Sequence, residues 1–135
     1  MSEAMYVGGS WRDCMARGDY EGAILRLARD CRARGAVLLY ADFYRAFSPY
    51  VEVHGDGVVG FHEAKLVEWA GLNHALMDAV TALQKRGRLV SVDVSATLYR
   101  QRGHYLDLPT HEGEPPAEGL DVWHWRPVGL VPGNR

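Results

Sequence analysis

The side chains best suited to holding an anion lie close together, between positions 85 and 104. This stretch carries five cations and one carboxylate, Asp93, for a net charge of +4 with histidine neutral; the cations are Lys85, Arg86, Arg88, Arg100 and Arg102. Residues 105–135 and residues 1–84 carry −3 each, which brings the whole chain to −2. A local positive patch on an acidic body is typical of a protein that contacts phosphate groups at one place.

A second set of polar side chains lies on the predicted outer face of a helix that begins at Asn73. Asn73 and His74 at its leading end are suited to hydrogen bonding with base edges in a major groove. Lys85, Arg86 and Arg88 at its far end are suited to phosphate contact. Arg100 and Arg102 are suited to it as well. The full set of proposed contacts is Asn73, His74, Met77, Thr81, Lys85, Arg86, Arg88, Arg100, Arg102 and His104.

Carboxylates and imidazoles between positions 52 and 63 offer a different chemistry. Glu52, His54 and Asp56 alternate along a predicted strand, and His62 and Glu63 follow. Such side chains can bind a divalent metal that activates water, as in a metal-dependent hydrolase. The spacing matches no HExxH or similar metal signature. We therefore predict no catalytic residue, no metal site and no cofactor, and rank a hydrolase third among the alternatives.

The phase of the apolar residues predicts two helices on either side of Gly71, over residues 62–70 and 73–86. A helix rotates by about 100° per residue, which places the apolar residues before Gly71 roughly 140° around the helix axis from those after it. A single straight helix therefore cannot bury both stripes of apolar residues. The first stripe is Leu66, Val67 and Ala70, and the second is Leu72, Leu76, Ala79, Val80 and Leu83. Glycine supplies the left-handed conformation that ends the first helix, and Asn73 caps the second.

Alternating residues then predict a strand over 88–100, a turn at 100–103 and a returning strand over 104–108. This order of elements resembles the second half of a winged helix-turn-helix, a fold used mostly to hold DNA. The resemblance covers residues 62–108 and implies an α+β, winged-helix-like fold: helices packed with a small antiparallel sheet and a β-hairpin wing. It also implies a homodimer that reads two half-sites, because such DNA binders commonly pair.

The remaining elements frame that region. Residues 19–34 are predicted to form an amphipathic helix capped by Asp19; its outer arginines are interpreted as solvated, with nucleic-acid contact as the alternative. Residues 36–47 fit either a short strand feeding a helix or one buried helix, and residues 50–61 a β-hairpin turning at 55–57. The expected division is an arm over 1–18, the winged-helix-like domain over 19–109, and a loop and strand extension over 110–135, with a strand at 120–125.

Length and composition indicate a single soluble domain. The 135 residues are 47% hydrophobic and 24% charged, which suffices for one core without metal or disulfide staples. No apolar run approaches the roughly 20 residues that span a bilayer, and the first residues lack a signal-peptide pattern. We expect a cytoplasmic protein with no membrane partner, whose two cysteines, Cys14 and Cys31, are reduced thiols.

The function that these patterns favour is sequence-specific binding of double-stranded DNA by a small transcriptional or accessory regulator that is not an enzyme. The alternative is a protein-binding module or inhibitor that uses a winged-helix-like fold without DNA. Aromatic residues near the two ends favour it, because tryptophan is a frequent anchor at protein interfaces; these are Tyr6, Trp11, Trp123 and Trp125. Burial of Trp123 and Trp125 in the core is the plainer interpretation.

Overall fold

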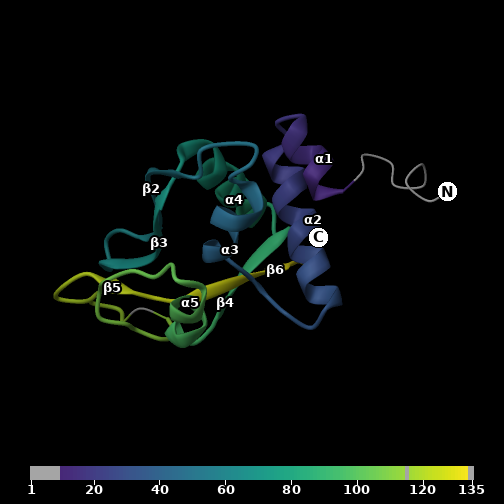
Figure 1. Cartoon of the computed structure of the whole chain (residues 1–135). Helices are drawn as coiled ribbons and strands as arrows, with labels where there is room; N and C mark the ends of the chain where they lie inside the picture. The colour runs from purple at the N-terminus through teal and green to yellow at the C-terminus, as the bar shows by residue number, and fades with distance from the viewer. Residues whose placement is uncertain (1–9, 115, 134–135) are drawn as a thin grey trace.

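Five helices and two three-stranded sheets make up the described part of the chain, residues 10–114 and 116–133 of a computed structural model (Figure 1). The helices are α1 Trp11–Ala16, α2 Tyr20–Ala33, α3 Tyr40–Phe47, α4 His74–Lys85 and α5 Ala96–Arg102. The strands are β1 Leu38–Leu39, β2 His54–Phe61, β3 Leu66–Leu72, β4 Leu89–Asp93, β5 His124–Trp125 and β6 Val128–Pro132. The predicted α+β class is confirmed. None of these helices combines the length and apolar character needed to cross a membrane.

The first sheet, here sheet A, has the strand order β1-β6-β4 and is antiparallel throughout. Leu130 of β6 is its central residue and faces Leu38 on one side and Ser91 on the other. Helix α2 packs against both β6 and α4, and β4 and β6 run beside each other in the middle of the molecule (Figure 1). Residues 110–135, expected to form an extension, therefore supply the strand that holds sheet A together.

The second sheet, sheet B, has the order β2-β3-β5. Its hairpin turns at residues 62–65, where Lys65 has a φ of 55°, so the turn predicted at residues 55–57 is wrong. That Gly-Asp-Gly segment instead lies inside β2, where the register with β3 is irregular. A Cβ on Gly55 would lie 2.5 Å from Asn73 Cα, so glycine is required where β2 passes the start of α4.

The helix predicted over residues 62–70 is wrong, because residues 66–72 form β3. This strand pairs with β2 on one side and β5 on the other, and Leu66, Val67 and Trp69 are all buried. A strand covered on both faces shows no alternation of apolar and polar residues, so its sequence can be mistaken for a helix. Gly71 does adopt a positive φ, 93°, but it ends a strand. The helix-turn-helix expected around it is absent from residues 62–73, all of which the structure describes.

The second predicted helix is confirmed as α4. Asn73 caps it, since its Oδ1 accepts a hydrogen bond from Leu76 N at 2.7 Å. The predicted buried stripe is also found, with Leu76, Val80 and Leu83 all in the core. The helix predicted over residues 19–34 is confirmed as α2, whose start is capped by Asp19 through Gly22 N at 3.0 Å.

The predicted wing hairpin is also wrong. Strand β4 ends at Asp93, and α5 follows, with Ser95 accepting a hydrogen bond from Thr97 N at 3.1 Å. Gly103 ends α5 in the left-handed conformation, with a φ of 79°. The predicted returning strand, residues 104–108, is not a strand. Consequently Arg100 and Arg102 lie in the last turn of a helix, and the partner of β4 is β6.

The described residues nearest the two ends of the chain also form regular elements. Residues 1–9 of the predicted arm and residues 134–135 lie outside the described residues, but α1 is formed and Trp11 is buried. The Trp11 ring packs edge-on against Phe47 and Tyr50, at centroid distances of 5.7 and 6.4 Å. Over residues 36–47, the strand-then-helix alternative is correct. The strand expected at 120–125 is shortened to β5, two residues long.

An aromatic cluster joins the two sheets. Trp69 of β3 stacks on Tyr99 of α5, whose ring meets Trp125 of β5 edge-on; both centroid distances are 5.2 Å. The buried Tyr99 hydroxyl donates to Val128 O at 2.5 Å and accepts from Tyr40 N at 3.1 Å. One hydroxyl thus connects α5 to the beginning of α3 and to the central strand of sheet A.

Replacing Tyr99 by phenylalanine should lower the free energy of unfolding by about 1–3 kcal/mol. The change leaves the ring in place but deprives the buried Val128 carbonyl and Tyr40 N–H of a partner, and unsatisfied buried groups cost that much. Urea denaturation followed by circular dichroism measures the loss. Tyr105→Phe is the control, since Tyr105 is 54% exposed; equal stability of the two variants would contradict the bridging role.

Candidate functional site

The residues proposed to read bases are engaged within the protein. Asn73 Nδ2 donates to Glu52 O at 2.6 Å, and His74 Nε2 lies 2.6 Å from Asp56 Oδ1. Met77 packs against β2, because a Cβ on Gly57 would lie 3.1 Å from its sulfur. Thr81 Oγ1 donates to Met77 O within α4, at 2.9 Å. The side chains at the leading end of α4 are therefore paired with residues before and within β2, although His74 and Asp56 are themselves exposed.

The residues assigned to the wing lie on and after α5, next to α3. Arg102 Nε donates to Asp42 Oδ1 at 3.1 Å, and the His104 ring stacks on Tyr44 at a centroid distance of 4.5 Å. The Arg100 guanidinium lies 6.0 Å from the Tyr105 ring centroid. None of these side chains lines the concave surface that is formed in part by Arg86 and Arg88. The cations between positions 85 and 104 therefore belong to two separate places.

A basic groove of about 240 Å³ lies between α2 and the end of α4. It is lined by Asp19, Glu21, Gly22, Leu25, Arg26, Arg29, Leu83, Arg86 and Arg88. Four arginines against two carboxylates give this basic groove a net charge of +2, and Lys85 is exposed in the last turn of α4 beside it. Arg86 pairs with Glu21, whereas Arg88 Nε is buried with no hydrogen-bond partner in the described structure.

Two of the groove arginines, Arg26 and Arg29, were interpreted from the sequence as solvated, with nucleic-acid contact as the alternative. Arg26 and Arg29 are three residues apart on α2 and so lie on the same side of that helix. Sequence periodicity placed them opposite the apolar stripe, which fits a solvated face equally well. Only the packing of α2 on α4 brings them to Arg86 and Arg88.

A second concave surface, the acidic cleft, lies where β4 of sheet A meets sheet B and has a volume of about 420 Å³. Glu68 of β3 is at its base and is only 5% exposed. The lining residues are Val59, Gly60, Phe61, Glu68, Gln84, Gly87, Leu89, Val90, Ser91, Glu114 and Arg126. Sequence analysis singled out none of its charged residues.

A hydrogen-bonded chain holds Glu68 in position. Ser91 Oγ donates to Glu68 Oε1 at 3.2 Å and accepts from Gln84 Nε2 at 2.8 Å. Burial raises the pKa of Glu68, and the Ser91 hydrogen bond and the Arg126 charge offset part of that rise. The arrangement is therefore a desolvated carboxylate at the base of an open cleft, which is a common feature of binding sites.

Arg126 is bound mainly to the carboxylate of Asp93 rather than to that of Glu68. Its Nε and Nη2 donate to the two oxygens of Asp93, at 2.8 and 3.3 Å, whereas its Nη1 lies 3.9 Å from Glu68 Oε2. These hydrogen bonds lower the pKa of Asp93 and raise that of Arg126. The bidentate pair is the strong interaction, and the contact with Glu68 is a longer electrostatic one.

The residues considered for a metal do not converge. His54 Nδ1 lies 3.3 Å from Glu52 Oε2, whereas Asp56 pairs with His74, so the predicted row divides into two exposed pairs. Within residues 10–114 and 116–133, no group of three or more histidine, cysteine, aspartate or glutamate side chains is arranged to hold a metal ion.

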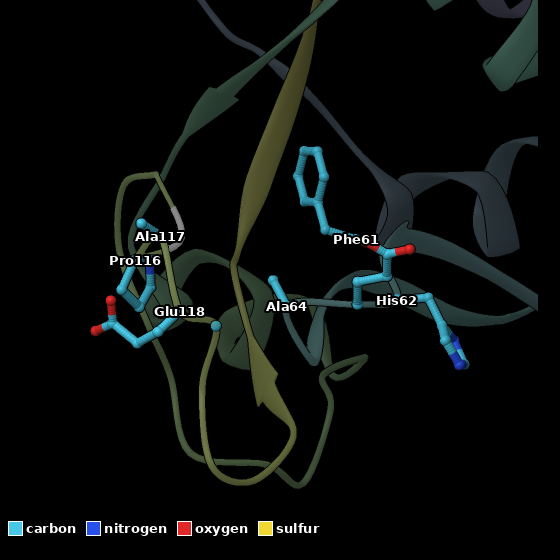
Figure 2. A pocket seen from close by; sticks show the side chains of 8 residues that line it. Phe61, His62, Ala64, Pro116, Ala117 and Glu118 are labelled. Atoms are coloured by element: carbon cyan, nitrogen blue, oxygen red, sulfur yellow. The ribbon is translucent and has the colours of Figure 1, made fainter.

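A hollow of about 640 Å³ lies between the β2–β3 turn and a loop at residues 116–119. Figure 2 shows Pro116, Ala117 and Glu118 on one side and Phe61 and Ala64 on the other, with the His62 side chain directed away from the loop. His62 instead meets the Trp123 ring edge-on, at a centroid distance of 5.3 Å. The side chains that line this hollow therefore form no convergent polar site.

Comparison of the chain with models of known families, with curated proteins and with solved structures finds no match. The function must therefore be inferred from the charge and geometry of the two concave surfaces.

Proposed function

We propose that the protein binds double-stranded DNA through its phosphate groups, and that the basic groove makes the contact. The observation that carries this proposal is the convergence of Arg26 and Arg29 with Arg86 and Arg88 at one concave surface. Guanidinium groups bind phosphate oxygens in a bidentate manner, and binding releases counterions from the duplex.

The topology of sheet A supports the same proposal. Helix α2, β1, α3, α4, β4 and β6 follow one another in the order helix, strand, helix, helix, strand, strand, and the strands form an antiparallel sheet of order β1-β6-β4. This arrangement resembles a winged helix, with residues 94–127 in place of a simple wing and the β2–β3 hairpin inserted between α3 and α4. The resemblance thus keeps only α4 and β4 from the stretch 62–108 that first suggested it, and its other helices and strands come from outside that stretch.

The binding that we propose has little sequence preference. Base readout needs side chains that are available to reach into a groove, whereas Asn73 and His74 are bonded to residues before and within β2. Phosphate contacts, by contrast, fix the position of the protein on the duplex without reading the base sequence. A nonspecific, salt-sensitive interaction is the form of DNA binding that the groove supports.

Replacing both Arg26 and Arg29 by glutamine should weaken duplex binding and flatten its salt dependence. Each lost phosphate contact reduces the slope of log K against log salt by about 0.9, so the pair should reduce it by roughly 1–2. The slope is measured by fluorescence anisotropy with a labelled duplex of about 20 base pairs. The titration is repeated at salt concentrations from about 20 to about 150 mM.

The matched control is Arg100→Gln with Arg102→Gln, which removes the same charge from α5, outside the groove. That variant should bind DNA with nearly the wild-type slope. Equal losses in the two double variants would show only a response to net charge, and absence of duplex binding by the wild type at the lowest salt would remove the proposal.

A further inference from the structure

We propose that the acidic cleft binds an extended segment of a partner protein and accepts an arginine or lysine side chain of that segment next to Glu68. The proposal concerns a different surface from the basic groove and does not depend on DNA binding. It assigns to the protein a second, cation-recognising site.

The charge of the cleft favours a cationic side chain. Glu68, Glu114 and the adjoining Asp93 outnumber Arg126, so the local net charge is −2. Because Asp93 occupies two nitrogens of Arg126, the nearest cationic atom to Glu68 Oε2 is 3.9 Å away. No described residue donates a hydrogen bond to that oxygen, although Glu68 is 95% buried. A carboxylate oxygen in a largely desolvated position gains most from a charged donor.

The rim of the cleft is apolar. Phe61 is 45% exposed and Val90 44%, and both line the cleft; Val58, which is on the same strand as Phe61 but does not line the cleft, is 52% exposed. Half of the large hydrophobic side chains that are exposed in the described structure therefore lie on β2 and β4, the strands beside the cleft. Apolar side chains gathered around a polar centre are typical of a surface that meets another protein.

The two rim strands can also accept an extended chain. In the described structure β2 pairs only with β3, and β4 only with β6, so each has a free edge. A free edge can pair with a segment in the β conformation, whose alternate side chains then point the same way. A basic residue directed at Glu68 would thus place its second neighbour near Phe61. Phe61 also lines the hollow in Figure 2, which gives the segment room to continue.

The test uses capped octapeptides with a fixed fourth residue and mixed valine, threonine and serine at the other positions. The fixed residue is arginine, lysine, citrulline or glutamate. Peptide binding to the full-length protein is measured by isothermal titration calorimetry. The arginine or lysine pool should bind at least about ten-fold tighter than the citrulline and glutamate pools, as expected for a charge-assisted hydrogen bond in a buried site. Glu68→Gln should reduce this preference to within about two-fold.

The control Glu52→Gln removes the same charge from an exposed side chain that lines neither the acidic cleft nor the hollow, and it should keep the preference. Since Glu68→Gln changes a buried residue, Phe61→Ser provides a second, exposed variant, which should weaken the basic pools about five-fold without loss of folding. Equal binding of the arginine and citrulline pools, or binding of butylguanidinium as tight as that of the peptides, would overturn the proposal.

Discussion

Trp69→Ala should lower the free energy of unfolding by about 4 kcal/mol, within the range for removal of a buried tryptophan. Trp69 is 3% exposed, and its ring lies between those of Tyr40 and Tyr99, with centroid distances of 6.0 and 5.2 Å. Its Nε1 also donates to the Tyr44 hydroxyl at 2.9 Å. The substitution removes the centre of the cluster that joins the sheets, and neighbours held by their own hydrogen bonds cannot collapse into the space.

The loss is measured by urea denaturation followed by far-ultraviolet circular dichroism, because the variant lacks a major fluorophore. Trp123→Ala is the control: Trp123 is half-buried and meets only the His62 ring among the described aromatic residues, so a loss below about 1.5 kcal/mol is expected. A similar loss in both variants would show that the cluster does not hold the sheets together.

Local signals in the sequence predicted two of the helices, α2 and α4, correctly. Asp19 and Asn73 cap α2 and α4 as expected, and the apolar stripe of α4 is buried as its spacing predicts. Such signals act over three or four residues, so they can be found in the sequence without knowledge of the fold.

The strands were harder to predict, because their pattern depends on what covers them. Residues 66–69 are buried in succession, so both faces of β3 are covered there, and the mostly apolar composition of the strand also fits a helix. Residues 88–100 alternate loosely throughout, so the pattern concealed the change from β4 to α5 at Ser95. The central strand β6 lies near the end of the chain, beyond the strand that was predicted at residues 120–125 of the extension.

Neither concave surface was predictable as a unit. Glu68 and Arg126 are separated by 58 positions, and Arg26 and Arg86 by 60; in each pair only the packing of sheets and helices brings the residues together. One signal was present in the sequence: Glu68 lies inside an apolar run, and Arg126 stands between Trp125 and Pro127. A charged residue within an otherwise buried stretch is rarely buried without a partner, and it can therefore mark a site.

Arg126→Ala should lower the free energy of unfolding by about 3 kcal/mol at pH 7, near the lower end of the range for breaking a buried ion pair. The Arg126 side chain is 10% exposed, whereas that of Asp93 is 42% exposed, which moderates the loss. Without Arg126, Glu68 remains buried beside Asp93 and Glu114 with no cation near it. Urea denaturation measures the change. Arg102→Ala, which breaks a more exposed pair with Asp42, should cost well under about 1 kcal/mol.

The pH dependence of this loss distinguishes an electrostatic role of Arg126 from simple packing. Arg126 holds the pKa of Asp93 below 3.8, so that interaction stabilises the fold above this value and is lost as the pH falls through the lower, folded-state pKa. Burial raises the pKa of Glu68 above 4.5, so its protonation stabilises the fold, and this contribution is lost as the pH rises through the folded-state pKa.

Removing the Arg126 cation raises the pKa of Glu68 further and increases the cost of its charged form. The difference in stability between the wild type and Arg126→Ala should therefore be largest near pH 7 and become smaller towards pH 4. A difference that stays constant over this interval would mean that Arg126 contributes through packing alone.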